Sequence, residues 1–269
     1  MNNILKDEFP FAEDILKDYT ALICGASKGI GRSSAQMLAR AGATIIACAR
    51  NEKDLKDLIS SLDGENHEFL VMDLENIDTI ENNITKLIED FGDIQILVNN
   101  SGGPPGGPLL DNNIEDFDGP IRRHLYASHI ITKALVPGME RSKMGRIINI
   151  ISTSVREPID NIGLSNTLRG AMGSWSKSLS RELPTCITIN NILPGFTDTD
   201  RLGSLSKSIS ERTGKSVEDV KETWMNGVPI KRLIDPLETA TAVTWLSLPS
   251  SGSIRGVSLP VDGGRMRSI

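Results

Sequence analysis

Short apolar runs alternate with longer amphipathic stretches along most of the chain. Seven of these runs hold four to seven mostly apolar residues bounded by turn-forming residues, as buried strands do. They span residues 19–24, 43–49, 69–72, 94–99, 146–151, 187–193 and 257–261. Strands separated by crossover helices pair in parallel and are covered on both faces. We therefore predict an α/β fold, a single doubly wound parallel sheet of about seven strands flanked by helices on both faces.

The ends of the chain and its linkers add little to this pattern. Residues 1–18 precede the first strand and are weakly amphipathic, which predicts an N-terminal arm or a short helix that packs on the body. No linker rich in proline or serine interrupts residues 19–269. We therefore expect residues 19–269 to form one domain that is large enough to bury a substantial core.

The composition argues against several classes of protein. Of the 269 residues, 39% are hydrophobic and 24% are charged, as in ordinary globular proteins. The net charge of −6 and the lack of a basic stripe argue against a nucleic-acid partner. The sequence has no signal peptide and no apolar segment long enough to span a bilayer. We expect no membrane partner and a cytoplasmic location.

The cysteines do not predict a metal site. Cys24, Cys48 and Cys186 lie far apart in the sequence without metal-ligand spacing, and two of them fall in predicted strands. We expect reduced thiols in the core and no bound metal.

A glycine-rich turn follows the first predicted strand and leads directly into a helical pattern that runs through Ala41. Glycines permit a tight turn, let the backbone approach a pyrophosphate and let a helix pack closely on a strand. The N–H groups at the start of the new helix then face the anion. The residues of this predicted phosphate cradle are Gly25, Ser27, Lys28, Gly29, Ile30 and Gly31.

Three motifs together give the chain a family resemblance. The glycine spacing, the segment Asn99-Asn100-Ser101-Gly102 and the closing segment at 261–264 resemble those of the short-chain dehydrogenase/reductase family, and of its 3-oxoacyl-acyl-carrier-protein reductases in particular. The resemblance runs from about Tyr19 to Gly264, although Cys24 stands where the family usually has threonine. It implies a Rossmann-type fold and hydride transfer with a nicotinamide cofactor.

The end of the second predicted strand favours NADP(H) over NAD. An NAD site of this architecture normally has a carboxylate here for the ribose 2′-hydroxyl, whereas arginine suits a 2′-phosphate. Ala49 offers no carboxylate, Arg50 follows it, and Lys28 could reach the same phosphate. The alternative is that both cations are solvated surface groups.

The resemblance implies further contacts with the cofactor. Asp73 and Leu74 would lie at the adenine, although Asp73 could instead be a helix N-cap. The other residues that the resemblance assigns to the cofactor are Asn100, Ser101, Gly102, Arg169, Pro194, Gly195 and Thr199.

The resemblance also implies four catalytic positions. In the family a tyrosine donates the proton, a lysine four residues later binds the ribose, a serine holds the carbonyl oxygen, and an asparagine anchors a water relay. Counting from the flanking segments puts Ser165 at the tyrosine, Arg169 at the lysine, Ser152 at the serine and His124 at the asparagine position. A serine is a poorer acid than a phenol of pKa about 10, and arginine cannot deprotonate. Arg169 can therefore position the ribose but cannot relay a proton.

His124 is a candidate proton donor, because an unperturbed imidazole pKa of about 6.5 suits general acid chemistry near neutral pH. We hypothesise that His124, directly or through water, protonates a substrate oxygen held by Ser152 and Ser165. The alternative is a histidine that is hydrogen-bonded in a helix interface and has no chemical role.

The resemblance implies an NADP(H)-dependent oxidoreductase that reduces the carbonyl of a small molecule, such as a 3-oxoacyl thioester or a related ketone. Reduction of a conjugated C=C bond and a non-catalytic NADP-binding scaffold are the alternatives. The segment near 201–227 resembles the family's substrate lid, although its pattern also fits two amphipathic surface helices. A homotetramer is expected by the same resemblance.

Overall fold

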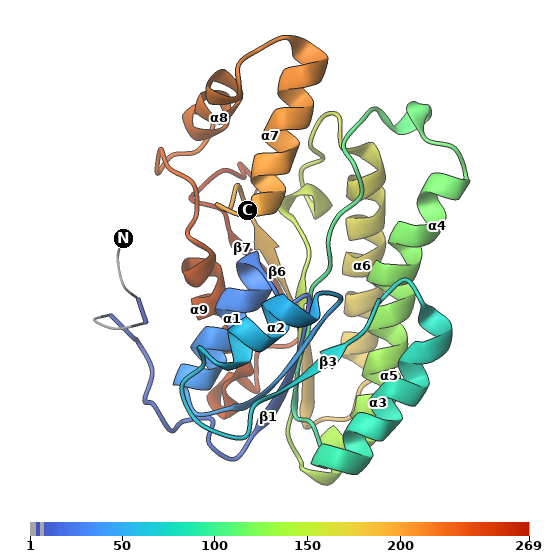
Figure 1. Cartoon of the computed structure of the whole chain (residues 1–269), viewed down its shortest axis with the longest axis vertical. Coiled ribbons are helices and arrows are strands. Elements are labelled where there is room, and N and C mark those ends of the chain that lie inside the picture. The colour runs from blue at the N-terminus through green and yellow to red at the C-terminus, as the bar shows by residue number, and fades with distance from the viewer. Residues whose placement is uncertain (1–3, 6–7, 269) are drawn as a thin grey trace.

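The computed structural model describes residues 4–5 and 8–268. Within them, seven parallel strands form one sheet in the order β3-β2-β1-β4-β5-β6-β7 (Figure 1). The strands are β1 (Thr20–Cys24), β2 (Thr44–Ala49), β3 (Glu68–Val71), β4 (Ile96–Asn99), β5 (Gly145–Ile150), β6 (Ile187–Pro194) and β7 (Ser258–Val261). The predicted fold class is confirmed, and each predicted strand is found within two residues of its expected bounds.

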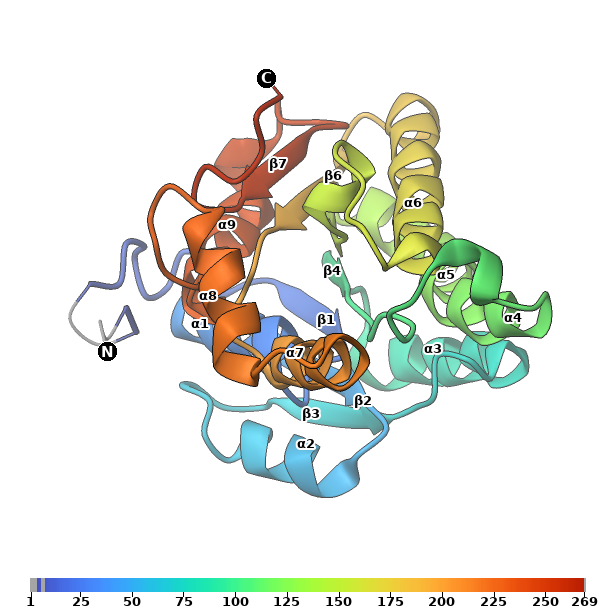
Figure 2. The ribbon, with the colours of Figure 1, turned by 90° about the horizontal axis from the view of Figure 1, so that it is seen from above.

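Helices cover both faces of the sheet, as Figure 2 shows from above. One core joins the sheet to α1, α2 and α9, and a second core joins the other face to α3, α5 and α6. The helices are α1 (Gly29–Arg40), α2 (Glu52–Ile59), α3 (Ile77–Phe91), α4 (Glu115–Ile121), α5 (Ala127–Arg141), α6 (Gly163–Glu182), α7 (Asp200–Thr213), α8 (Val217–Asn226) and α9 (Pro236–Ser247). Short 3₁₀ turns lie at Leu109–Asp111, Thr153–Val155 and Pro249–Ser251.

Helix α3 illustrates how the sequence pattern produces these layers. Ile80, Ile84 and Leu87 recur at helical spacing and are buried, whereas the charged residues of the helix face outward. The glycine that follows, Gly92, has a φ of 76°, so the chain leaves the helix in a backbone conformation that glycine adopts without strain. Helices α2 and α5 likewise bury apolar residues on the side that faces the sheet.

Residues 8–18 form turns rather than the short helix that was one of the two expectations for this segment. Leu16 is fully buried in the core on the α1 side, and its N–H donates a 2.8 Å hydrogen bond to the carbonyl of Ala41. Arg40 of α1 forms an ion pair with Glu13 at 2.6 Å and lies over the ring of Phe9. These contacts hold the segment against the body of the protein.

The strand order reverses between β1 and β4, because the chain runs outward from β1 through β2 to β3 and then returns to the other side of β1. Open parallel sheets bind ligands in the crevice outside the carboxyl ends of their strands at such a point. Helices α7 and α8, from the segment expected as a lid, stand above this end of the sheet (Figure 1). Phe196 stacks on Trp224 of α8 with ring centroids 5.2 Å apart.

Candidate active site at the carboxyl ends of the strands

A cleft of about 800 Å³ opens at the carboxyl ends of the strands, beneath α7. Nearly all the residues predicted to form the site line it, although they come from segments between residues 25 and 199 of the chain. The predicted residues that line it are Gly25, Ser27, Lys28, Gly29, Ile30, Arg50, Asp73, Leu74, Asn100, Ser101, Gly102, Ser152, Ser165, Arg169, Pro194, Gly195 and Thr199. Gly31 and His124 are not among the lining residues.

The glycine turn needs its glycines for two different reasons. Gly25 and Gly29 have positive φ angles of 61° and 53°, in the left-handed region that side chains disfavour. Gly31 does not line the cleft, but a Cβ atom there would lie 2.2 Å from the carbonyl oxygen of Gly25. Asn100 Nδ2 donates to that oxygen at 3.2 Å and to the carbonyl of Cys24 at 3.3 Å. The turn is therefore held in a shape that leaves the first N–H groups of α1 free for an anion.

Two cations flank the end of the cleft beside β2. Lys28 Nζ lies 3.7 Å from carboxylate oxygens of both Asp54 and Asp200, and Arg50 Nη1 lies 4.0 Å from Asp73. The side chains of Lys28 and Arg50 are 62% and 73% exposed, so a ligand can reach both of them. This arrangement fits a phosphate group better than the ribose hydroxyls of NAD, because Ala49 presents no carboxylate.

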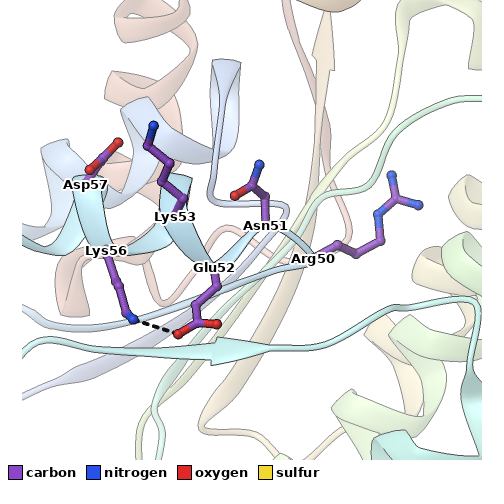
Figure 3. Close-up of a pocket in the computed structure, with 6 residues that line it drawn as sticks. All are labelled: Arg50, Asn51, Glu52, Lys53, Lys56 and Asp57. Carbon is purple, nitrogen blue, oxygen red and sulfur yellow. Dashed lines mark ion pairs between the residues drawn. The ribbon is translucent and has the colours of Figure 1, made fainter.

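Arg50 also borders a second, shallower hollow of about 910 Å³ at the start of α2 (Figure 3). Asn51 caps that helix by accepting a hydrogen bond from the N–H of Asp54, and Lys56 forms an ion pair with Glu52 at 2.7 Å. Figure 3 shows the Arg50 side chain extending away from Lys53 and the other residues of the hollow. Arg50 therefore serves the main cleft, whereas Lys53 belongs to the outer hollow alone.

Asp73 is not a helix N-cap, which was the alternative expectation for this residue. Its Oδ1 atom accepts a hydrogen bond of 3.0 Å from the N–H of Glu75, and Asn76 is the residue that precedes α3. Asp73 thus closes a local turn and remains at the wall of the cleft, where the family resemblance expects the adenine.

A ladder of buried amides lies beneath the cleft, and sequence reasoning did not identify it as a unit. Asn99 of β4 donates to Asn149 of β5 at 2.9 Å, and Asn149 donates to Asn191 of β6 at 3.0 Å. Asn191 in turn donates to Ser258 Oγ of β7 at 3.0 Å. The signal in the sequence was an asparagine near the end of three successive strands, but only the strand register aligns them.

Ser152, Ser165 and Arg169 meet at the other end of the cleft. Ser152 follows β5 and accepts a hydrogen bond of 3.1 Å from the N–H of Ser154, so its own hydroxyl hydrogen is free to donate. Ser165 and Arg169 lie one turn apart on α6 and therefore share a helix face. These are the side chains that the resemblance assigned to the reaction.

Arg169 is a buried cation held by backbone carbonyl groups. Its Nη1 atom donates to Ile150 at 2.7 Å, and Nη2 donates more weakly to Ser101 at 3.4 Å. Burial, together with the positive charges of Arg201 and Arg123, lowers the pKa of Arg169 to about 10. It therefore stays charged at neutral pH, and it positions ligands rather than relaying protons.

His124 does not line the cleft, so the structure does not support direct contact between its ring and a substrate. The residue lies in a π-helical turn, Arg122–Tyr126, and its Nδ1 atom shares a hydrogen bond of 2.6 Å with Ser101 Oγ. Burial and the nearby charges of Arg169 and Arg123 hold the pKa of His124 well below its ordinary value. The imidazole is therefore neutral near pH 7, and any part in proton transfer has to pass through Ser101 or water.

Sequence reasoning did not place Arg201, Arg123 and Arg265 in the site, and all three border the cleft. Arg201, at the start of α7, donates to the carbonyl of Pro104 across the cleft, and burial together with Arg123 lowers its pKa. Arg123 donates to the carbonyl of Gly102 at 2.9 Å and forms an ion pair with Glu75. No local motif marks Arg201 or Arg123, because each reaches the site from a helix that tertiary packing brings there.

Two of the three cysteines lie side by side in the fold, which their separation in the sequence does not suggest. Cys24 and Cys48 are far apart in the sequence but are register partners on adjacent strands, and both are buried free thiols. A hydrogen bond that the Cys48 thiol donates to Cys24, together with burial, raises the pKa of Cys48 well above its usual value. Over residues 4–5 and 8–268, no cluster of three or more histidine, cysteine or acidic side chains could hold a metal ion. No helix in that same part of the chain is long and apolar enough to cross a membrane.

Comparison with known proteins identifies the family of the chain. The family model for short chain dehydrogenases matches residues 19–210, and the chain belongs to that family. It is 33% identical to the 3-oxoacyl-acyl-carrier-protein reductase FabG of Vibrio harveyi over 252 residues, which cover 93% of this chain and 98% of that relative.

Solved structures share the whole fold. The L-sorbose reductase of Gluconobacter frateurii, in complex with NADPH and L-sorbose, matches with a TM-score of 0.89 and 25% identity, over 96% of this chain and 100% of that one. A variant of actinorhodin polyketide ketoreductase with NADPH matches with a TM-score of 0.88 and 27% identity, again over 96% and 100% of the two chains. The chain is thus an oxidoreductase of the short-chain dehydrogenase family with ketoreductases among its relatives.

Proposed function

We propose that this protein uses NADPH to reduce the carbonyl group of a small molecule, either a 3-oxoacyl thioester or a related ketone. The observation that carries the proposal is that one cleft joins the glycine turn and its two flanking cations to Ser152, Ser165 and Arg169. The similarity to FabG and the NADPH-bound ketoreductase structures support the same reaction.

The residues present fit a dinucleotide phosphate cofactor. A Cβ atom at Gly25 would lie 2.7 Å from Asn100, so only glycine fits at this point of the turn. The first N–H groups of α1 would face the pyrophosphate, and Lys28 and Arg50 would bind the 2′-phosphate. Asp73 and Leu74 would border the adenine, while Pro194, Gly195 and Thr199 would border the nicotinamide. When bound, the cofactor supplies the hydride.

The chain's own groups act on the carbonyl oxygen. Ser152 and Ser165 donate hydrogen bonds to this oxygen and fix its position. Arg169 contributes a positive field as negative charge develops there, and such an effect is strong in a cleft with little water. The guanidinium also binds the ribose hydroxyls, since its Nε and second Nη hydrogens remain available beyond the two backbone bonds.

The proton follows a different route from the one the family uses. The hydroxyl of Ser165 passes its proton to the substrate oxygen and recovers one from water in the cleft. Neutral His124 orients Ser101, whose carbonyl in turn accepts from Arg169. Reduction is favoured over alcohol oxidation because oxidation requires a strong general base, and neither serine nor arginine supplies one.

The experiment that tests this proposal measures NADPH oxidation by the purified protein with 3-oxoacyl thioesters, small ketones, quinones and enals. The double variant Ser165→Tyr plus Arg169→Lys, which restores the residues of the family motif, is assayed in parallel. Reduction of carbonyl compounds by the unaltered protein is the expected result.

Other outcomes contradict the proposal. Turnover of enals alone would assign C=C reduction instead. Activity only in the double variant, with NADPH still bound by the unaltered protein, would identify a cofactor-binding scaffold without its own chemistry.

We also propose, on the family resemblance, that the chain assembles as a homotetramer through α5, α6 and β7. Size-exclusion chromatography with light scattering should give four times the chain mass. A monomer would refute the assembly without affecting the proposed reaction.

A further inference from the structure

We call the end of the cleft that holds Ser152, Ser165 and Arg169 the reaction end. Three polar groups converge on one point there. A Cβ atom built on Gly103 would lie 3.5 Å from Arg201 Nη2, 3.7 Å from Arg169 Nη2 and 3.8 Å from Ser165 Oγ. These distances are ordinary van der Waals contacts, so an atom of this size fits beside Gly103 without displacing its neighbours. An oxygen atom close to this point would be within reach of two guanidinium groups and one hydroxyl.

The positive charge at this point has no carboxylate partner among the described residues. No carboxylate there lies within 4.0 Å of Arg169 or Arg201, and Arg265, which also lines the cleft, has no ion pair either. Arg123 is different, because Glu75 neutralises it. Burial and the charges of Arg201 and Arg123 lower the pKa of Arg169, and burial together with Arg123 lowers the pKa of Arg201. Arg169 is a buried cation without a carboxylate partner, and such a charge is costly, so a ligand that brings an anion here is favoured.

The cofactor's pyrophosphate does not explain this charge. The phosphate cradle is at the start of α1, where Gly29 adjoins Thr199. Arg201 instead extends across the cleft to the carbonyl of Pro104, and its guanidinium and Ser165 Oγ both lie within 4 Å of the point beside Gly103. The charge without a carboxylate partner thus shares this point with the hydroxyl that would hold the substrate's reacting oxygen.

We propose that Arg201 and Arg169 form a carboxylate subsite, and that the substrate is a small oxo acid rather than an uncharged ketone. Arg201 binds the carboxylate, and Arg169 lies between the carboxylate and the oxygen held by Ser165. Leu205, Ile209 and Trp224 line the cleft as well and provide apolar contact for the carbon chain. The reaction assigned to the oxo acid rests on the proposed function, whereas the carboxylate subsite does not.

The first test therefore measures binding without turnover. Malonate and succinate, which the enzyme cannot reduce, are titrated by calorimetry into the NADPH-saturated protein, alongside their dimethyl esters. At least one diacid should bind, and its ester should bind at least about tenfold more weakly, because a charged hydrogen-bonding partner contributes roughly 1.5–3 kcal/mol. Binding of neither diacid, or equal binding of acid and ester, would overturn the proposal.

Two variants distinguish the contribution of the Arg201 charge from that of the space beside Gly103. Arg201→Gln should weaken diacid binding about tenfold to a hundredfold, and Arg212→Gln, an exposed arginine of the same helix, should leave it unchanged. Gly103→Ala keeps every charge but places a methyl group between the three donors, so it should also weaken binding. Gly107→Ala is its control, because a Cβ there meets nothing within 4 Å.

A second measurement links the subsite to the reaction. The ratio of kcat/KM for acetoacetate to that for methyl acetoacetate should exceed ten and should fall towards one in Arg201→Gln. If Arg201→Gln weakens NADPH binding instead and leaves diacid binding intact, Arg201 holds the cofactor and the subsite is wrong. If diacids bind as expected but no carbonyl compound is reduced, the subsite stands and the proposed function fails.

Discussion

The two ends of the cleft are built by different means. At the end beside β1 and β2, backbone geometry forms the site: Gly25 and Gly29 adopt positive φ angles, and Gly31 leaves no room for a side chain. At the end beside β5 and α6, side chains on ordinary backbone form the site, namely Ser165 and Arg169. The family resemblance predicts that the first end keeps the family pattern and that the second departs from it.

The difference shows which parts of such a site can change without loss of the fold. A side chain at Gly25 or Gly31 would collide with a backbone carbonyl oxygen, so these two positions can change little. Ser165 is half-buried on the wall of the cleft, and its helix is held by other residues, such as Leu168 and Met172. The reaction end can therefore acquire new side chains, and with them new substrates, on an unchanged scaffold.

The largest expected effect comes from a substitution in the glycine turn, at the end of the cleft that backbone geometry forms. Gly31→Ala should weaken NADPH binding about tenfold to a hundredfold and lower Tm, because its Cβ would lie 2.2 Å from the carbonyl oxygen of Gly25 and such overpacking costs roughly 1–3 kcal/mol. Fluorescence titration with NADPH and a thermal melt check both effects. Gly203→Ala is the control, because it is also helical and its Cβ meets nothing within 4 Å. Unchanged NADPH binding by Gly31→Ala would contradict the conclusion that backbone geometry forms this end of the cleft.

A smaller effect tests the two cations of the same end. The double variant Lys28→Gln plus Arg50→Gln should reduce the preference for NADPH over NADH about tenfold, because each exposed cation contributes a modest charge-assisted contact with the 2′-phosphate. Steady-state kinetics with both cofactors measure the ratio. Lys53→Gln is the matched control, since Lys53 borders only the outer hollow (Figure 3). A preference that survives the double variant would mean that other groups select the cofactor.

The smallest expected effect tests whether the pKa of His124 is lowered in the folded protein. Its folded-state pKa is lowered, so the unfolded state binds more protons below about pH 6.5, and the free energy of unfolding should fall as pH decreases from 7 towards 5. The contribution of this residue cannot exceed about 1.4 kcal/mol per pH unit. Urea unfolding across this range should show the slope, and His124→Asn should remove it. His129→Asn changes an exposed histidine nearby and should not.

The rate of reduction gives an independent check of the same residue. If a protonated His124 were the acid, kcat would fall as pH rises through about 6.5. We expect no such loss, because the buried imidazole is already neutral there. A decline that disappears in His124→Asn would restore the general acid role.

The amino-acid sequence predicted the order of strands and helices and the glycine turn, and the family resemblance predicted the positions of Ser152, Ser165 and Arg169. The strands, helices and turn depend on local rules, namely the periodicity of apolar residues and the backbone freedom of glycine. Arg50 after β2 likewise pointed to a 2′-phosphate without any knowledge of its neighbours.

Only the tertiary structure decided how the groups at the reaction end are charged and oriented. His124 is neutral because it is buried beside Arg169 and Arg123, and Arg201 joins the site because α7 folds back over the strands. Desolvation and Coulomb interactions depend on which distant residues are packed together, and no local pattern encodes that. The sequence therefore predicted where the reaction would take place, and the packing of distant helices sets which charges surround that place.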